Sequence, residues 1–328
     1  MAILVTGGAG YIGSHAVYEL SKKGYEVVII DSLEKGHKEA ILAGKLYVGN
    51  LRDEELLKNV FTENKIEAVI HFAAYSLVGE SVEKPEKYYE NNLVSTMKLL
   101  NAMKEYGCKY IVFSSTAAVF GEPDSIPITE QNAKNPTNTY GETKLSMEKM
   151  LKWYDVAYGI KSVALRYFNA AGADVSGKIG EDHTPETHLI PLVLNVALGK
   201  RESIKIFGDD YPTEDGTCIR DYIHVTDLAN AHILALEYLK KNNISDVFNL
   251  GNGKGYSVRQ VIDTARKVTG VEIKEEISPR RNGDPAILIA TSEKAQNVLG
   301  WKPMYNSLET IIETAWKFHK NNPNGWKK

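Results

Sequence analysis

Residues 6–13, TGGAGYIG, follow a short apolar run at the start of the chain. Glycines at this spacing permit a tight turn after a strand, let the backbone approach a pyrophosphate, and leave the first N–H groups of the next helix free for an anion. Asp31 ends the next apolar run, 18 residues after Gly13, where a carboxylate can accept hydrogen bonds from an adenosine ribose. The stretch predicts a dinucleotide-binding unit; a plain tight turn and an aspartate that only caps a strand end are the alternatives.

Further apolar runs continue the same pattern along the chain. They occupy residues 3–6, 27–31, 46–48, 68–73, 110–114 and 162–166, and helical spacing separates them at residues 53–62, 85–106 and 140–158. Apolar runs without alternation are typical of strands that are buried on both faces of a parallel sheet. We therefore predict an α/β fold, a doubly wound parallel sheet of the Rossmann type with a second, smaller α/β lobe for a substrate.

The domain boundary is predicted at the stretch 172–184, which is rich in glycine and charge. Residues 1–169 are assigned to the cofactor lobe and residues 170–328 to the substrate lobe. Residues 222–225, a helix at about 226–240 and residues 247–250 look like one more α/β pair. Residues 220–250 are therefore expected to return to the first sheet.

Composition excludes several classes of protein. The 328 residues are 43% hydrophobic and 25% charged with a net charge of −3, which argues against disorder, nucleic-acid binding and membrane-surface binding. Cys108 and Cys218 lack CxxC spacing, and His183 and His188, five apart, do not share a helix face, so no metal is predicted. Without a leader or an apolar run of about 20 residues, we expect a cytoplasmic protein whose partner is a small molecule.

Tyr140 and Lys144 lie four residues apart, so on a helix they share one face. They follow the apolar run that ends near Thr116, and carboxyl ends of parallel strands are where ligands bind. A phenol has an ordinary pKa near 10 and needs a nearby positive charge to act as a base near neutrality, which Lys144 would supply. Tyr140, Lys144 and Thr116 are the candidate catalytic residues. Tyr18 and Lys22 have the same spacing, and we interpret that pair as solvated surface.

Seven motifs carry a resemblance to a known family. They are TGGAGYIGSH at 6–15, HFAA at 71–74, KYYENN at 87–92, SSTAAVFG at 114–121, TYGETK at 139–144, LRYFN at 165–169 and FGDDYPTEDGTCIRDYIHV at 207–225. Across almost its whole length the chain resembles the extended short-chain dehydrogenase/reductase family, and the last motif is typical of its sugar-nucleotide 4-epimerases. The resemblance implies tightly held NAD, oxidation and re-reduction at C4 of a UDP-hexose, and a homodimer.

The resemblance also implies which residues line the two ligand sites. The cofactor residues would be Gly7, Gly10, Tyr11, Ile12, Gly13, Asp31, Ser32, Asn50, Leu51, Phe72, Ala73, Ala74, Ser76, Asn91, Lys144 and Phe168. The substrate residues would be Thr116, Tyr140, Asn169, His188, Leu189, Lys205, Phe207, Arg220, Arg281, Asp284 and Leu288. Asp31 favours NAD⁺ over NADP⁺, because a ribose phosphate beside a carboxylate meets like charge.

Four positions depart from the common family pattern. Asn50 replaces an aspartate, Ser76 a lysine, His188 an asparagine, and Leu288 a tyrosine or cysteine. The first two bear on how firmly NAD is held, and the last two bear on the contacts to the sugar.

Two other functions compete with epimerisation. A nucleotide-sugar 4,6-dehydratase or decarboxylase needs an extra acid or base after the strand that precedes Thr116, where this chain has Ala117 and Ala118. A regulator that binds NAD without turnover has no need of Tyr140 and Lys144.

Overall fold

The computed structural model describes residues 1–281 and 284–326, and a parallel sheet of seven strands forms its base. The sheet order is β11-β6-β5-β4-β1-β2-β3. Its strands are β1 (Ala2–Thr6), β2 (Glu26–Asp31), β3 (Lys45–Val48), β4 (Ile66–His71), β5 (Tyr110–Ser114), β6 (Lys161–Arg166) and β11 (Asp246–Asn249). The strand order reverses between β1 and β4, so a ligand crevice is expected beyond their carboxyl ends. The predicted doubly wound α/β fold is confirmed.

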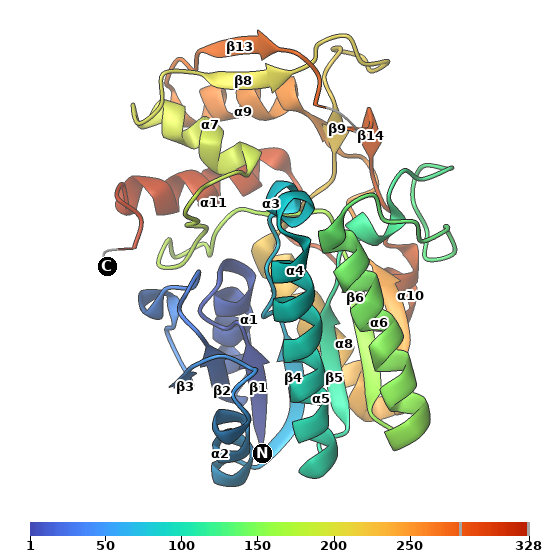
Figure 1. Ribbon diagram of the computed structural model, residues 1–328. Helices are drawn as coiled ribbons and strands as arrows, with labels where there is room; N and C mark the ends of the chain where they lie inside the picture. Colours follow the sequence, from blue (N-terminus) through green and yellow to red (C-terminus); the bar gives the residue numbers. More distant parts are fainter. Residues whose placement is uncertain (282–283, 327–328) are drawn as a thin grey trace.

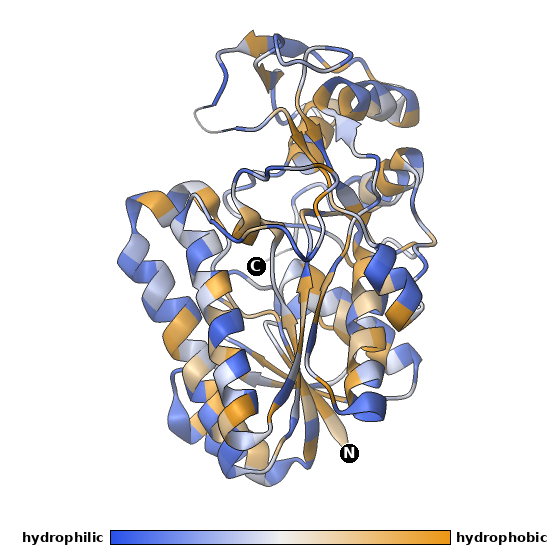
Figure 2. Cartoon of the chain, turned by 90° about the vertical axis from the view of Figure 1, so that its right-hand side faces the viewer, coloured by the Kyte–Doolittle hydropathy of each residue, from blue (hydrophilic) through white to orange (hydrophobic). Residues whose placement is uncertain are grey.

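Helices cover both faces of this sheet. One face carries α1 (Tyr11–Lys22), α8 (Val225–Asn242) and α10 (Glu293–Leu299), and the other carries α2 (Glu54–Glu63), α5 (Ser95–Glu105) and α6 (Thr139–Tyr158). In β1, Ile3 and Val5 pack into the first core while Leu4 packs into the second. Because successive side chains of a strand point to opposite faces, burial on both sides explains the uninterrupted apolar run. Figure 2 shows the apolar strands between helices with hydrophilic outer faces.

The second lobe lies over the carboxyl ends of the strands (Figure 1). It contains α7 (Leu189–Ala197), α9 (Val258–Thr269), α11 (Leu308–Asn321), and the paired strands β8 (Ile204–Phe207) and β13 (Glu275–Ser278). A small sheet joins β12 (Tyr256–Ser257), β9 (Ile219–Arg220) and β14 (Ile287–Leu288). The three helices share one apolar core with Ile204 and Ile206 of β8.

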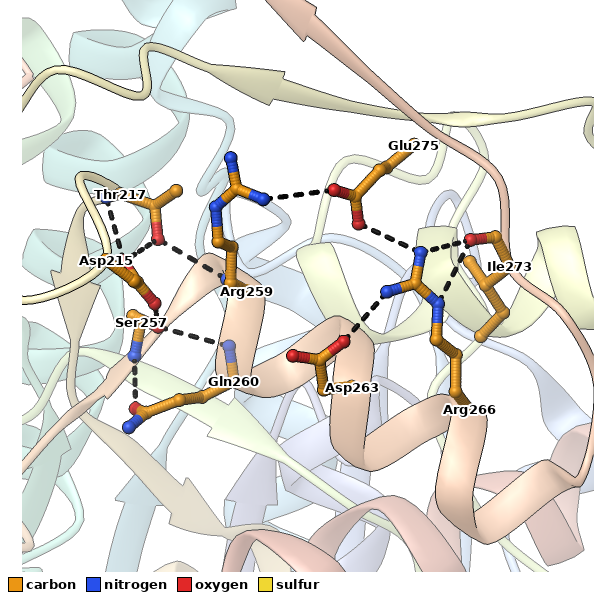
Figure 3. A network of polar contacts seen from close by, with 9 residues as sticks. All are labelled: Asp215, Thr217, Ser257, Arg259, Gln260, Asp263, Arg266, Ile273 and Glu275. Carbon is orange, nitrogen blue, oxygen red and sulfur yellow. Dashed lines mark hydrogen bonds and ion pairs between the residues drawn. The ribbon is translucent and has the colours of Figure 1, made fainter.

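Polar contacts fix α9 within this lobe (Figure 3). Ser257 caps the helix and forms a capping box with Gln260, and the Ser257 hydroxyl also donates to Asp215. At the far side, Glu275 of β13 accepts from Arg259 at 3.1 Å and from Arg266 at 2.9 Å. The loop before β9 and the strand β13 are therefore both tied to one helix.

The later α/β pair returns to the first sheet only in part. α8 packs on the sheet and β11 pairs with β6, but β10 (Tyr222–His224) pairs in parallel with β7 (Asn169–Ala171) instead. β7 continues the chain past the carboxyl end of β6, which carries this pairing beyond the edge of the main sheet. The expectation that all of residues 220–250 rejoin that sheet is wrong for β10. Trp301, which follows α10, is also buried in the first core.

Two segments that connect strands also position the site. β4 ends at His71, so Phe72 and Ala73 leave the strand earlier than predicted. The stretch predicted as one helix at 85–106 divides into α4 (Pro85–Tyr88), a π-helical turn (Tyr89–Val94) and α5. The short helix α3 (Val78–Glu83) precedes it and packs on α6. Among the described residues, no helix is both long and apolar enough to cross a membrane.

Candidate active site

The glycine turn lies between β1 and α1. Gly7 has a φ of 73°, in the left-handed region that favours glycine. A Cβ at Gly7 would lie 2.7 Å from the backbone N of Ala73, and one at Gly13 would lie 2.1 Å from the carbonyl O of Gly7. No side chain caps the first N–H groups of α1. The cradle therefore excludes any larger residue and fits the pyrophosphate of a dinucleotide.

Asp31 fastens this turn to the end of β2. Its Oδ2 accepts from the backbone N–H of Ala9 at 2.9 Å, and its Oδ1 accepts from that of Leu33 at 2.8 Å. Burial raises the pKa of Asp31, and the two backbone hydrogen bonds act in the opposite direction. Each carboxylate oxygen keeps a second lone pair, so this structural role leaves room for a hydrogen bond from a ribose hydroxyl.

The other predicted cofactor residues gather at the same edge of the sheet. The backbone N–H groups of Phe72 and Ala73 both donate to the carbonyl O of Thr6, at 3.0 and 3.1 Å, which joins the loop after β4 to the glycine turn. Asn91 lies in the π-helical turn, and such turns are frequent at functional sites. Gly10, Ser32, Asn50, Ala74, Ser76 and Phe168 lie in segments that follow strands of the main sheet.

Three further predicted cofactor residues also make side-chain contacts within the protein. Ile12 packs against the first core, and Leu51 is buried in the second. The Tyr11 hydroxyl donates to the carbonyl O of Gly172 at 2.6 Å. Tyr11 therefore links the glycine turn to the segment that enters the second lobe.

Tyr140, Lys144 and Thr116 meet where β5 ends. Asn138 caps α6 by accepting from Gly141, which sets Tyr140 and Lys144 on the first turns of this helix. The Lys144 ammonium donates to the carbonyl O of Ser114 at 2.9 Å and lies 5.9 Å from the centre of the Tyr140 ring. The Thr116 hydroxyl accepts from the backbone N–H of Ala118 at 3.1 Å, and it is close enough to the Tyr140 phenol to act on its pKa. The three residues that the sequence singled out therefore lie in one place.

Burial dominates the protonation of this group. It raises the pKa of Tyr140 to about 12, and the neighbouring Thr116 hydroxyl acts in the opposite direction. Burial also lowers the pKa of Lys144 to about 7, with the negative charge of Glu148 opposing it. The expected lowering of the phenol pKa is thus not produced by the protein alone, because removing both groups from water disfavours their charged forms.

Sequence reasoning missed two residues that hold α6 in place. The buried Ser81 of α3 accepts from the backbone N–H of Tyr140 at 3.1 Å. Glu148 accepts from the Ser115 hydroxyl at 2.6 Å and pairs with the buried Arg166 of β6. Glu148 lies one helical turn beyond Lys144, so its spacing was a usable signal, whereas only the fold brings Ser81 to α6.

The Tyr18 and Lys22 pair lies on the surface of α1 and contacts the loop that enters the second lobe. The Lys22 ammonium lies 4.1 Å from the centre of the Tyr18 ring and 3.5 Å from the carboxylate of Asp174, whose side chain is 3% exposed. The Lys22 side chain itself is 42% exposed, which agrees with the interpretation of this pair as solvated surface.

Five of the predicted substrate residues come from separate segments of the second lobe. The Arg281 guanidinium lies 4.0 Å from the centre of the Phe207 ring. Arg220 forms an ion pair with Asp284, and β14 places Leu288 opposite Arg220 in the small sheet. These contacts place the Arg220 guanidinium and the Asp284 carboxylate at β9 and the Arg281 guanidinium at the end of β8, and the backbone N–H of Asp284 donates to the carbonyl O of Arg281 at 3.3 Å.

A second group lines a small cavity between the lobes. Asn169, His188 and Leu189 contribute to its wall together with Tyr222 and Glu181. The Asn169 amide donates to the carbonyl O of Asp221 at 2.9 Å, which orients that side chain. Lys205 is exposed on β8, and within residues 1–281 and 284–326 no contact places it with the other substrate residues.

The loop before α7 brings His183 and His188 together. Their ring centres are 5.2 Å apart, and both face the carboxylates of Glu181 and Glu186. The sequence argument that five residues keep them apart assumed a helix, whereas this segment is an irregular loop that ends at the N-cap of α7. The neighbouring carboxylates raise the pKa of His183 to about 9, and that of His188 also rises.

Comparison with known proteins covers nearly the full chain. Residues 3–251 match the model of the NAD dependent epimerase/dehydratase family. A UDP-glucose 4-epimerase of Halalkalibacterium halodurans is 62% identical over 99% of this chain and 98% of its own. A crystal structure of a UDP-glucose 4-epimerase is 56% identical with a TM-score of 0.99 and covers all of both chains. Another, from Bifidobacterium longum in complex with NAD⁺ and UDP, is 43% identical with a TM-score of 0.94 over 99% of this chain and 100% of its own.

Three observations point to the same family. They are the glycine cradle after β1, the proximity of Tyr140 and Lys144, and the full-length similarity to these proteins. The chain belongs to the NAD dependent epimerase/dehydratase family.

Proposed function

We propose that this chain is a UDP-glucose 4-epimerase that interconverts UDP-galactose and UDP-glucose with NAD as its cofactor. The observation that carries the proposal is the meeting of Tyr140, Lys144 and Thr116 beyond β5, on the sheet edge that also holds the glycine turn. Relatives with this name cover nearly the whole chain. Bound NAD would accept a hydride from C4 of the hexose and return it, so the net redox change is zero.

Each of the three residues has a separate role in this chemistry. Tyr140 takes the proton of the C4 hydroxyl as hydride leaves C4, and gives it back when hydride returns to the other face of the 4-keto sugar. Lys144 would hold the nicotinamide ribose, and the Thr116 hydroxyl, which lies near the phenol, would hydrogen-bond the sugar oxygen. A positive nicotinamide ring would lower the phenol pKa, which burial raises to about 12 in the protein alone.

The substrate would extend from this point into the second lobe. Arg220 and Arg281 suit a diphosphate, because guanidinium groups offer forked donors to phosphate oxygens. Leu288 and Phe168 pack on the same small apolar cluster as Ala117, which follows Thr116 directly. This contact supports placing Leu288 beside the hexose. We place Asn169, His188, Leu189, Lys205, Phe207 and Asp284 around the remainder of the nucleotide sugar.

One assay discriminates between the candidate functions. The purified protein is incubated with UDP-galactose without added NAD, and the products are separated by chromatography. An epimerase produces UDP-glucose, a dehydratase produces a dehydrated 4-keto nucleotide sugar, and a regulator returns UDP-galactose unchanged. A decarboxylase also leaves UDP-galactose unchanged, because this sugar has no carboxyl group, and releases CO₂ only from a UDP-hexuronate supplied in a parallel reaction. Methyl side chains at Ala117 and Ala118 leave no acid or base there for the second outcome.

Removing Arg281 should weaken the binding of free UDP. A hydrogen bond to a charged group contributes about 1.5 to 3 kcal/mol, so we expect Arg281→Ala to raise the Kd for UDP roughly 10- to 100-fold in isothermal titration calorimetry. Arg280→Ala is the matched control, because Arg280 stacks 4.1 Å from the centre of the Tyr211 ring in the same way but pairs with Asp210. Equal UDP affinity in both variants would mean that Arg281 is a solvated surface residue that does not contact the diphosphate.

Arg220 gives a related result with a different cause. Arg220→Ala should also weaken UDP binding, and it leaves the Asp284 carboxylate without its ion-pair partner. The double variant with Asp284→Asn removes the unpaired carboxylate as well. Comparison with the single variant therefore distinguishes the loss of the Arg220 contact from the effect of the unpaired Asp284 charge.

Leu288 should set the tolerance for a 2-N-acetyl group. A leucine is shorter than a tyrosine but longer than a cysteine, so the space for the acetyl group is intermediate. We therefore expect UDP-galactose to be preferred and UDP-N-acetylgalactosamine to be turned over measurably but more slowly. Leu288→Tyr should lower kcat/KM for the acetylated substrate about 10- to 100-fold and leave UDP-galactose within a few-fold, since pocket size contributes about 1 to 3 kcal/mol. An unchanged ratio of the two efficiencies would mean that Leu288 does not face the sugar.

We also propose that the protein is a cytoplasmic homodimer. Both cysteines are free and buried, which suits a reducing compartment. On α6, the side chains of Trp153 and Val156 are 65% and 69% exposed, and large apolar groups on one helix favour association. We expect a dimer mass in sedimentation equilibrium and a monomer for Trp153→Glu. Val298→Glu, on the exposed side of α10, should leave the mass unchanged.

A further inference from the structure

We propose that Glu181, His183, Glu186 and His188 bind one Zn²⁺ ion, which fixes the loop before α7 against the glycine turn. The four side chains each offer one ligand atom, and these atoms all lie within 4.8 Å of one another. The inference concerns a site apart from Tyr140 and Lys144, and it holds whether or not the chain is an epimerase.

The two histidines and two carboxylates converge on one point. The His188 Nδ1 lies 2.8 Å from Glu181 Oε1 and 3.1 Å from Glu186 Oε1. The His183 Nδ1 lies 3.3 Å from Glu181 Oε1 and 3.7 Å from Glu186 Oε2. Ligand atoms bonded to tetrahedral zinc at about 2.0 to 2.1 Å are separated by roughly 3.4 Å, so these spacings suit that geometry.

Two buried polar atoms of the cluster lack well-aligned hydrogen bonds. Glu181 Oε1 and His183 Nδ1 are fully buried, and neither makes a well-aligned hydrogen bond among the described residues, although Glu181 Oε1 lies 2.8 Å from the His188 Nδ1. The side chain of Glu181 is 5% exposed. An ion pair between protonated histidines and carboxylates leaves the His183 Nδ1 contacts at 3.3 and 3.7 Å, too long or poorly aligned to satisfy it. A cation that accepts lone pairs from all four groups satisfies every one of them.

The donor set selects the class of metal. Imidazole nitrogens together with carboxylate oxygens suit Zn²⁺ and neighbouring transition metals, while Mg²⁺ and Ca²⁺ prefer oxygen ligands alone. Two carboxylates and two neutral imidazoles carry a charge of about −2, which a divalent ion neutralises. Glu186 Oε1 already accepts from the backbone N–H groups of Thr187 and His188, so its Oε2 is left to bind the ion.

The neighbours of the cluster explain what the ion would stabilise. The Tyr11 ring centre lies 6.1 Å from that of His183, at the start of α1. Asp182, between two of the ligands, accepts from the backbone N–H of Trp326 at 2.8 Å and lies 3.6 Å from the His37 Nε2. His188 is the N-cap residue of α7, so an ion at its Nδ1 holds the start of that helix and leaves its Nε2 for the adjoining cavity.

Metal content provides the test. The full-length protein is stripped with dipicolinate, incubated with equimolar ZnCl₂, desalted, and assayed by inductively coupled plasma mass spectrometry. We expect about one zinc per chain, and His183→Gln or Glu186→Gln should lower the affinity at least 100-fold, since removing even an outer-shell partner costs about 10- to 100-fold. His37→Gln is the matched control, because His37 faces a carboxylate of the same loop and is not one of the four ligands. Its zinc content should equal that of the wild type.

A second measurement does not depend on how the variants fold. Co²⁺ replaces zinc in the wild-type protein, and a tetrahedral N/O site produces visible d–d absorption bands that saturate at one equivalent. Zinc loading should also raise the Tm of the wild type and leave that of Glu186→Gln unmoved. A wild type that retains no zinc, shows no tetrahedral cobalt spectrum and has a Tm indifferent to zinc would overturn the proposal and leave an ion-pair cluster.

Discussion

Replacing Tyr140 with phenylalanine should abolish most turnover while the fold and the bound cofactor remain. The change removes only the hydroxyl, so the ring keeps its packing and the backbone N–H of residue 140 keeps its hydrogen bond to Ser81. General acid–base catalysis contributes about 10²- to 10⁴-fold, and we expect kcat for UDP-galactose to fall by that factor. The measurement is single-substrate kinetics, with cofactor content determined from the absorbance of released NAD.

A control variant and the pH dependence of kcat provide two further checks of this prediction. Tyr18→Phe should be silent, because the Tyr18 ring contacts Lys22 on α1 and is not one of the residues at the end of β5. If the phenolate is the base, kcat of the wild type rises with pH until the phenol has lost its proton, and the pKa of about 12 in the protein alone must fall when the cofactor cation is present. Near-normal turnover by Tyr140→Phe would assign the base to another group.

The protein should bind NAD⁺ far more tightly than NADP⁺. Asp31 is 8% exposed and lies beside the turn that receives the pyrophosphate, where a 2′-phosphate would meet its carboxylate. Two unit charges 5 Å apart at an effective dielectric constant of 20 repel by about 3 kcal/mol, on the order of 100-fold in affinity. Titration calorimetry of cofactor-free protein with each dinucleotide measures this ratio.

Asp31→Asn distinguishes the effect of the Asp31 charge on cofactor choice from the role of its side chain in holding the glycine turn. The asparagine keeps one oxygen to accept from Ala9 or Leu33, so the turn should persist while the repulsion disappears. We expect the preference for NAD⁺ to fall at least about tenfold. Tighter binding of NADP⁺ by the wild type would mean that Asp31 serves only to hold the glycine turn.

Some features of this protein could be predicted from local sequence. The TGGAGYIG stretch, the apolar runs of the sheet and the four-residue spacing of Tyr140 and Lys144 depend on backbone geometry over a few residues. A turn that needs a positive φ demands glycine at Gly7, and a strand covered on both faces demands an unbroken apolar run. Such requirements act within one element, so they are visible without knowledge of its neighbours.

Other features were decided only when distant segments came together. Three contacts join residues whose sequence spacing carries no periodic signal. They are the pairing of β10 with β7, the contact of Lys22 with Asp174, and the convergence of His183 and His188 on two carboxylates. The pKa values of Tyr140 and Lys144 also depend on the tertiary structure, because burial of the two side chains is the largest cause of both shifts. Desolvation and loop conformation arise from contacts between elements, and a sequence pattern within one element does not encode them.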